Sequence, residues 1–338
     1  MERPLVLLTL SLGALGLGLA SSAALTQQKS EISITRQPGI IYLPSHVMEK
    51  QQLIERQAEK LGVPNLKVNW ASLSGGGVQT DALLSGNVDV VNTGVGNILL
   101  LWDRTKGGVK GIVANSALPL TLISRNPSIK TLKDFGPTDK IAVPTIKVST
   151  QAILLQMAPE KTFGPDQTTK LDANTVQLGH PDAMLALSNP QGEITSHFSA
   201  PPYSFMELKS VKGAHVILTS PEIIGGPLTQ SQFFTTTRFA DANPKVVSAI
   251  KAASLEAIEF IRKNPRAAVE IYREVTNDKT SVDELLELLN QPGMMEWIAA
   301  PQGTMKFAAH LYKVGTLKTM PKAWTDYYLS TAHDLPGS

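Results

Sequence analysis

The chain has 338 residues, with 31 Lys and Arg against 29 Asp and Glu, and it has no cysteine. This length is enough for two domains of ordinary size. The mixed charge, with no basic cluster interleaved with aromatic residues, gives a nucleic-acid-binding role little support. The absence of cysteine excludes disulfides, thiolate metal sites, a cysteine nucleophile and lipid attachment through a cysteine.

Residues 1–24 have the pattern of a secretory signal peptide. Arg3 forms a weak basic region, Leu5–Leu19 is apolar, and Ser22 and Ala24 occupy the −3 and −1 positions of a cleavage before Leu25. The apolar run has about 15 residues, whereas a spanning helix needs roughly 20, so we favour export over a membrane anchor. We therefore expect a soluble monomer that is periplasmic or secreted after cleavage.

Strands and helices alternate along the chain, which is typical of a parallel sheet with helices on its faces. In the first part we expect strands at 31–36, 66–71, 88–92 and 109–115, and helices at 46–61, directly after the glycines at 75–77, and at 97–105. A transition covers 118–135. The alternation then restarts, with strands at 140–144, 174–178, 193–198 and 214–219, and helices at 150–158 and 181–188.

The last third is expected to begin with a strand within 225–239 that returns to the first unit, followed by helices. Two of these helices begin with the same pair, Asn243-Pro244 and Asn264-Pro265. Asparagine is a favoured N-cap residue and proline a favoured first helical residue. Two more helices are expected at 281–290 and 304–315.

Two glycine-rich loops, "LSGGG" at 73–77 and "GVG" at 94–96, precede helices. Free amides at a helix start can hold a carboxylate, sulfonate or phosphate-like oxygen. "LSGGG" is close to the signature of transporter ATPases, but no Gly-Lys pair occurs in the chain, and "GVG" lacks the third glycine of a dinucleotide fingerprint. A nucleotide site is therefore excluded, while a tight turn without a ligand stays open for Gly75–Gly77.

Several segments, in this order, resemble the solute-binding proteins of ABC importers in the nitrate/sulfonate/taurine group, which includes relatives of the thiamine-pyrimidine synthase. They are "QPGIIYLPSHVMEKQQLIE", "GGGVQTDALLSGNVDVVNTG", "HFSAPPY", "NPRAAVEIY" and "VGTLKTMPKAWTDYY". The resemblance implies an α/β, two-lobed fold of the type II periplasmic-binding-protein kind, with two crossover strands and a ligand cleft between the lobes. The lobes would be 25–117 with 228–338, and 118–227. Hinges are expected at Asn115–Thr121 and Gly225–Gln230.

The resemblance places the glycine loops and the equivalent loops of the second lobe at the mouth of the cleft, where strand ends and helix starts converge. We predict these ligand-binding residues: Gln37, Gly39, Tyr42, Ser74, Gly75, Gly76, Gly94, Asn97, Thr145, Ser149, Thr150, Ser199 and Tyr203.

Plainer roles remain open for several of them. Ser149 and Thr150 suit helix N-caps, and Tyr42 could be a packed surface tyrosine. His180, which precedes a helix, is interpreted as a loop residue. Arg36, Arg125 and Lys147 could pair with an anionic ligand, although only Lys147 lies inside a candidate loop. Metal-ligand spacing is absent, so we predict neither a metal nor a cofactor.

The function implied by the resemblance is capture of a small organic anion, such as a sulfonate or carboxylate, or of a pyrimidine-like compound. Two lobes would close on the solute and deliver it to a membrane permease with its ATPase. Nitrate suits the chain less well, because the candidate loops hold no cluster of cations.

One alternative is an enzyme of the thiamine-pyrimidine-synthase type. Such enzymes use a cysteine-rich segment, which this chain lacks, and a nucleophile elbow is also absent. Another alternative is a ligand-presenting partner of a membrane sensor.

Overall fold

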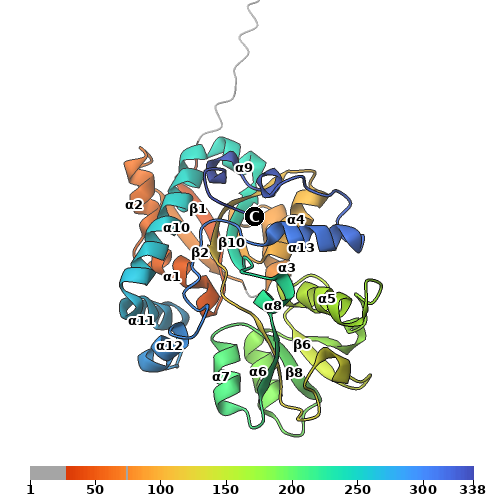
Figure 1. Ribbon diagram of the computed structural model, residues 1–338. Coiled ribbons are helices and arrows are strands. Elements are labelled where there is room, and N and C mark those ends of the chain that lie inside the picture. The colour runs from red at the N-terminus through yellow and green to blue at the C-terminus, as the bar shows by residue number, and fades with distance from the viewer. Residues whose placement is uncertain (1–27, 74) are drawn as a thin grey trace, which may run out of the picture.

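The protein folds into two lobes, one above the other in Figure 1, each built on a five-stranded sheet with helices packed against it. The computed structural model describes residues 28–73 and 75–338. The predicted signal peptide and its cleavage site therefore lie outside the described residues. The two-lobed α/β fold predicted from the sequence is confirmed.

The sheet of the first lobe has the strand order β2-β1-β3-β10-β4. Its strands are β1 (Glu31–Arg36), β2 (Lys67–Ser72), β3 (Val90–Thr93), β4 (Val109–Ser116) and β10 (Ser231–Thr236). β1 runs parallel to β2 and β3, whereas β10 is antiparallel to both β3 and β4. The sheet is therefore mixed, because the chain returns from the second lobe and inserts β10 between two strands of the first.

The sheet of the second lobe has the order β7-β6-β8-β5-β9. Its strands are β5 (Thr121–Ser124), β6 (Lys140–Val143), β7 (Thr175–Gln177), β8 (Ile194–Ser199) and β9 (His215–Thr219). β5 is antiparallel to β8 and β9, and it lies inside the stretch that we interpreted as a transition. Its four residues are too few to show a strand period in the sequence.

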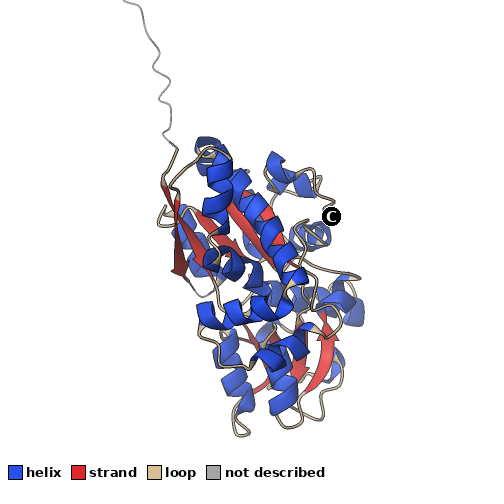
Figure 2. Cartoon of the chain, turned by 90° about the vertical axis from the view of Figure 1, so that its left-hand side faces the viewer, coloured by secondary structure: helices blue, strands red, loops and turns tan. Residues whose placement is uncertain are grey.

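Helices cover both sheets (Figure 2). Those of the first lobe are α1 (Leu43–Lys50), α2 (Leu53–Lys60), α3 (Gly76–Leu84), α4 (Val95–Arg104), α9 (Thr237–Ala242), α10 (Pro244–Lys263), α11 (Pro265–Thr276), α12 (Val282–Leu289) and α13 (Thr304–Lys313). Those that follow strands of the second lobe are α5 (Thr150–Phe163), α6 (His180–Ser188), α7 (Tyr203–Ser210) and α8 (Ser220–Ile224).

One local expectation was wrong, and another was met only in part. The helix expected at 46–61 is split into α1 and α2, because Gln52 adopts a left-handed conformation with φ 51°. Asn243 and Asn264 do occupy the N-cap positions with proline next to them, as predicted, but neither side chain bonds to an amide of the helix that follows. Instead, each side-chain amide donates to a carbonyl of the preceding helix, at Phe239 and Phe260, so each asparagine ends one helix just before the next begins.

The chain crosses between the lobes through residues 117–120 and 225–230, within the two stretches predicted as hinges. The crossings are tied together, since the amide of Gln230 donates to the carbonyl of Ser116 at 2.7 Å. The C-terminal region of the chain joins them: the amide of Ala117 donates to Glu296, and that of Thr229 to Gln302. The lobe boundaries at 117 and 228 remain a prediction, although the two sheets divide as that prediction requires.

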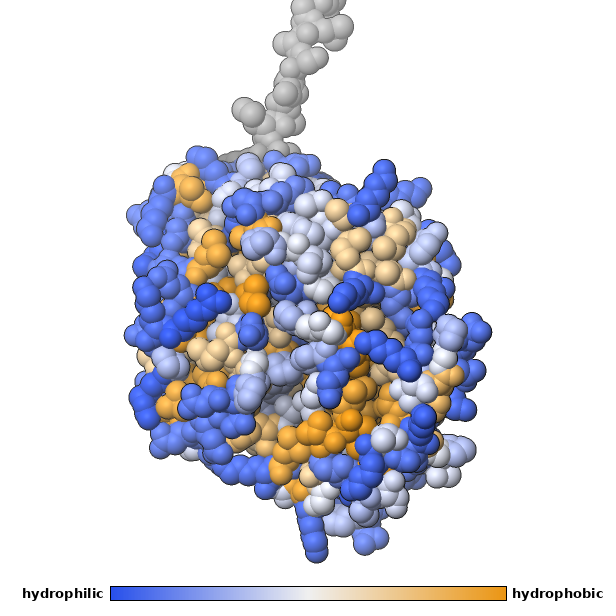
Figure 3. Space-filling model, viewed as in Figure 1, coloured by the Kyte–Doolittle hydropathy of each residue, from blue (hydrophilic) through white to orange (hydrophobic). Residues whose placement is uncertain are grey.

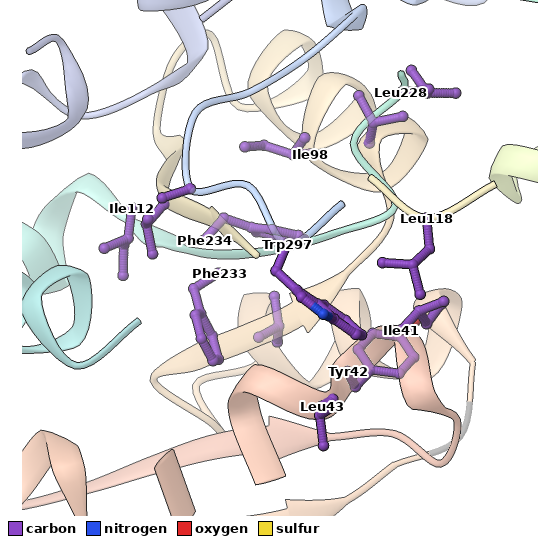
Figure 4. Packing of buried hydrophobic residues seen from close by; sticks show 14 of the residues in the cluster. Ile41, Tyr42, Leu43, Ile98, Ile112, Leu118, Leu228, Phe233, Phe234 and Trp297 are labelled. Carbon is purple, nitrogen blue, oxygen red and sulfur yellow. The ribbon is translucent and has the colours of Figure 1, made fainter. Parts of the chain in front are cut away.

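Buried aromatic and aliphatic residues of the first lobe fix the loops nearest the junction. Trp297 is fully buried, lies beside Ile41 and Tyr42 in Figure 4, and belongs to the same buried cluster as Phe233. Burial of such side chains stabilises the fold by about 2 kcal/mol each. Trp297 therefore helps to hold the turn at Ile40–Tyr42 in place.

The face drawn in Figure 3 is mainly hydrophilic at its margins, with hydrophobic residues gathered toward its lower half. Among the helices of the described residues, none has the length and apolar character needed to cross a membrane.

Candidate functional site

A cavity of about 360 Å³ lies where the loops that follow the strands of both sheets meet. The first lobe lines it with loops after β1, β2 and β3, and the second lobe with loops after β6, β7 and β8. Gln230, in one crossing segment, completes the wall. Carboxyl ends of strands from two sheets thus converge on one polar cavity, which is the usual place for a ligand in open α/β sheets.

The structure brings almost all of the predicted site residues to this cavity. Those that line it are Gln37, Gly39, Tyr42, Gly75, Gly76, Gly94, Asn97, Thr145, Ser149, Thr150 and Tyr203. Ser199 is fully buried and lies outside the lining, and Ser74 lies outside the described residues. Contact of these residues with a ligand remains a prediction.

Gln37 organises the wall of the first lobe. Its side-chain amide donates to the hydroxyl of Tyr42 at 2.8 Å and to the carbonyl of Asn92 at 3.0 Å. Its Oε1 accepts from the backbone amide of Gly75 at 3.1 Å. The Gly75 amide is thus already paired, so the free donors at the start of α3 are the amides that follow it, beginning with Gly76.

Glycines are required where the two lobes approach each other. A Cβ at Gly94 would lie 2.7 Å from Thr150 Oγ1, and one at Gly96 would lie 2.7 Å from the carbonyl of Val148. Both partners belong to the loop and first turn of α5 in the second lobe. Any larger residue would push the lobes apart, so the glycines of this loop allow α4 and α5 to meet at the edge of the cavity.

Ser149 is the N-cap of α5. Its hydroxyl accepts from the amide of Ala152 at 3.2 Å and donates to the carbonyl of Thr145 at 2.8 Å. The predicted capping role of Ser149 is therefore confirmed. Thr150 is the first residue of the helix rather than its cap.

A buried chain of hydrogen bonds, which no sequence pattern predicted, leads away from the cavity. Gln151 Nε2 lies 3.1 Å from His180 Nε2, His180 Nδ1 lies 2.9 Å from His197 Nε2, and His197 Nδ1 lies 2.6 Å from Glu207 Oε1. Tyr203 stacks on the His180 ring, with centroids 5.8 Å apart. His180 is thus a wall of the cavity and not a plain loop residue.

No sequence signal pointed to this chain, because its members come from α5, α6, β8 and α7. Neither a helical nor a strand period relates their positions. Only the order of β6 and β8 in the sheet, with α6 and α7 packed beside them, brings them together.

The cavity carries little charge. Burial lowers the pKa of His197 to about 3 and holds that of His180 well below its usual value, so both rings are uncharged at neutral pH. Burial also raises the pKa of Glu207 to about 8. Among the described residues that line the cavity, none is Lys or Arg, and Asp182 is the one acidic side chain.

The three candidate cations lie elsewhere. Arg36 forms an ion pair with Glu49 at 2.6 Å. Arg125 donates to the carbonyls of Pro190 and Gly192, and Lys147 is exposed and does not line the cavity. Within the described part of the chain, no cluster of three or more acidic or histidine side chains is placed to hold a metal ion.

Ion pairs bridge the lobes on either side of the cavity. Lys313 of α13 lies 2.5 Å from Glu160 of α5. Lys209 of α7 lies 3.3 Å from both Glu284 and Glu287 of α12. All of these side chains are partly exposed, so each pair contributes about 0–1 kcal/mol. The lobes are therefore in contact at both ends of the cavity.

Solved structures with a similar fold were found, although no protein-family model and no curated protein matches the chain. The alkanesulfonate-binding protein SsuA from Xanthomonas axonopodis pv. citri, bound to MOPS, is 15% identical with a TM-score of 0.68, over 87% of this chain and 96% of that chain. The periplasmic aliphatic sulphonate-binding protein SsuA from Escherichia coli is 17% identical with a TM-score of 0.67, over 90% and 93%. The periplasmic nitrate-binding protein NrtA from Synechocystis PCC 6803 is 14% identical with a TM-score of 0.67, over 86% and 83%. The resemblance inferred from the sequence is thus confirmed at the level of the fold.

Proposed function

We propose that this protein is the extracytoplasmic solute-binding component of an ABC importer, which encloses a small solute between its lobes and delivers it to a membrane permease with its ATPase. The observation that carries the proposal is the polar cavity lined by strand-end loops of both lobes. A ligand held there contacts both lobes at once, so it stabilises their closed arrangement. The fold that the chain shares with binding proteins for sulfonates and nitrate supports the same role.

The lining favours an uncharged, hydrogen-bonding solute over an anion. A buried anion needs a paired cation or several free donors. The lining offers neither lysine nor arginine, so an anion would depend on the free amides at the start of α3. Amide side chains and hydroxyls, including Gln151, Asn97 and Thr93, provide both donors and acceptors, while Tyr203 and His180 provide ring faces. Of the two ligand classes that the resemblance implies, the pyrimidine-like compound therefore fits this cavity better than the sulfonate.

Binding is favoured over catalysis by the way in which the histidines are used. His180 and His197 have both of their ring nitrogens engaged with Gln151, with each other and with Glu207. Neither presents a free base to the cavity. A role as the partner of a membrane sensor has the same site, and genes for a permease and an ATPase beside this one would favour uptake.

A thermal-shift screen of the exported protein tests the proposal. Cytosine and thymine represent uncharged solutes, and taurine, ethanesulfonate and nitrate represent the charged classes. A solute at one hundred times its dissociation constant adds about 2.7 kcal/mol of stability. We expect stabilisation by uncharged heterocycles. Stabilisation by sulfonates or nitrate alone would contradict the ligand class, and a full solute library without any stabilising compound would contradict the binding role.

A further inference from the structure

The chain Gln151–His180–His197–Glu207 connects the cavity with a carboxyl group that solvent does not reach. Gln151 lines the cavity, whereas His197 and Glu207 are fully buried. Glu207 Oε2 has no partner within hydrogen-bond distance among the described residues, although the nearby Ser199 hydroxyl lowers the pKa of the carboxyl; Oε1 makes its one close bond, to His197. A buried carboxyl with one partner that can both donate and accept is able to hold or release a proton there.

Each uncharged imidazole has one donor and one acceptor nitrogen, so the whole chain must point in one of two directions. With Glu207 ionised, His197 donates from Nδ1 to Glu207, His180 donates from Nδ1 to His197, and Gln151 donates from Nε2 to His180. This is the direction compatible with the Gln151 orientation in the structure. The Oε1 of Gln151, an acceptor, is then the atom left for a ligand.

With Glu207 protonated, every bond reverses. Glu207 donates to His197 Nδ1, His197 donates from Nε2 to His180 Nδ1, and His180 donates from Nε2. Gln151 must then turn its Oε1 to His180, because two donors cannot face each other. Its Nε2, a donor, becomes the atom left for a ligand.

We propose that the proton on Glu207 determines, through His197 and His180, whether Gln151 presents an acceptor or a donor to the bound solute. The inference rests on the proposed binding function, and it names Gln151 as a specificity-determining residue set by a group that the ligand does not touch. In the ionised state the site selects a solute with an N–H or O–H group at this point. In the protonated state it selects a carbonyl or ring nitrogen.

The hydrogen bonds themselves provide the path of the proton. As the Gln151 amide turns away, a proton from the cavity binds His180 Nε2, the proton on His180 Nδ1 passes to His197 Nε2, and the proton on His197 Nδ1 passes to Glu207 Oε1. One proton has been taken up, each ring stays uncharged, and the chain has reversed. Imidazoles are suited to this shuttle because they bind a proton at either nitrogen.

The titratable groups around Glu207 leave this switch undisturbed. His197 and Ser199 of β8 face Glu207. The other titratable groups nearby are His180 and the exposed Asp182 on α6, and Tyr203 on α7, the helix that carries Glu207. Tyr203 faces Asp278 of the first lobe. Lys209, also on α7, is exposed and paired with Glu284 and Glu287. The proton on Glu207 is therefore shared chiefly with the two histidines.

Long-range ¹H–¹⁵N correlation spectra of the exported protein, labelled with ¹⁵N-histidine, test the inference without any ligand. They show which ring nitrogen carries the proton. Between pH 6 and 9.5 we expect His180 and His197 to change together, from Nε2–H at low pH to Nδ1–H at high pH, with one shared midpoint. In Glu207→Gln both tautomers should become independent of pH. The exposed Glu193→Gln, in the same lobe, should behave as the wild type.

Different tautomers on the two rings, or tautomers that stay fixed throughout this range in the wild type, would overturn the inference. The wild-type titration decides the matter even if Glu207→Gln fails to fold. Since no solute is added, failure of this experiment leaves the binding function intact, and failure of the solute screen leaves this experiment valid.

Discussion

Glu207 shows how one buried carboxyl couples the stability of this protein to pH. Burial raises the pKa of Glu207 from 4.5 to about 8, so the folded protein keeps a proton that the unfolded chain has released. Its contribution to stability is therefore complete below pH 4.5 and is lost as the pH rises toward 8. The buried histidines act in the opposite direction, because burial lowers the pKa values of His46, His180 and His197 in the folded protein while the unfolded chain still binds protons near pH 6.5.

Between pH 6.5 and 8 we expect the free energy of unfolding of the wild type, relative to that of Glu207→Gln, to fall by on the order of 1 kcal/mol per pH unit. The variant itself should keep only the opposite slope of the histidines, because its new side chain does not titrate. Urea denaturation at several pH values in this window measures the slope. An identical slope in both proteins would mean that Glu207 ionises normally in the folded state.

Gly76 lies against a residue of the cavity wall. A Cβ at this position would lie 2.5 Å from Asn97 Oδ1, whereas a Cβ at Gly77 would meet nothing within 4 Å. Gly76→Val should therefore displace the Asn97 side chain and weaken binding of a solute found in the screen by at least tenfold, about 1.4 kcal/mol. The stability of the fold should change little, because the end of the Asn97 side chain can move aside. Gly77→Val is the matched control.

Calorimetry on both glycine variants, with circular dichroism to verify folding, measures this effect. Equal affinities for Gly76→Val and Gly77→Val would show that the glycines shape the turn without contributing to the site. That was the plainer role left open for them by the sequence.

At the scale of elements, α5 depends on its cap. Because the Ser149 hydroxyl pairs with both Ala152 and Thr145, Ser149→Ala should lower the free energy of unfolding by about 1 kcal/mol. Ser188→Ala removes an exposed hydroxyl that bonds to Met184 within α6, and it should have a much smaller effect. Chemical denaturation of both variants compares them, and a Ser149→Ala protein as stable as the wild type would contradict the capping role.

Elements with a local signal were predictable, and those defined by distant contacts were not. Strand, glycine loop and helix follow one another at 67–84 and 90–104, so turn chemistry and apolar periodicity locate both the elements and their loops. β5 was missed because it is short. The Gln151–Glu207 chain was missed because the sheet order and the packing of α6 and α7 assemble it, and no sequence period reports either.

For the whole molecule, the ion pairs at both ends of the cavity show that the lobes are in contact. The Lys313–Glu160 pair on one side and the Lys209 pairs on the other are partly exposed and weak. Hinge motion at 117–120 and 225–230 must also separate α4 from α5 at Gly94 and Gly96 and break the bond from Lys306 Nζ to the carbonyl of Ile224. We expect the ligand-free protein to open at these hinges, and a solute that contacts both lobes to favour this closed arrangement.

Small-angle X-ray scattering of the exported protein, with and without a saturating solute from the screen, tests the central claim that the lobes enclose the solute. We predict that the radius of gyration falls on addition of the solute and that the bound curve matches the present structure. Far-ultraviolet circular dichroism should not change, because closure is a rigid-body motion of the lobes. Gly76→Val provides the control, since it should need at least tenfold more solute for the same compaction. A solute that binds tightly while the scattering curve stays unchanged would contradict capture by closure of the two lobes.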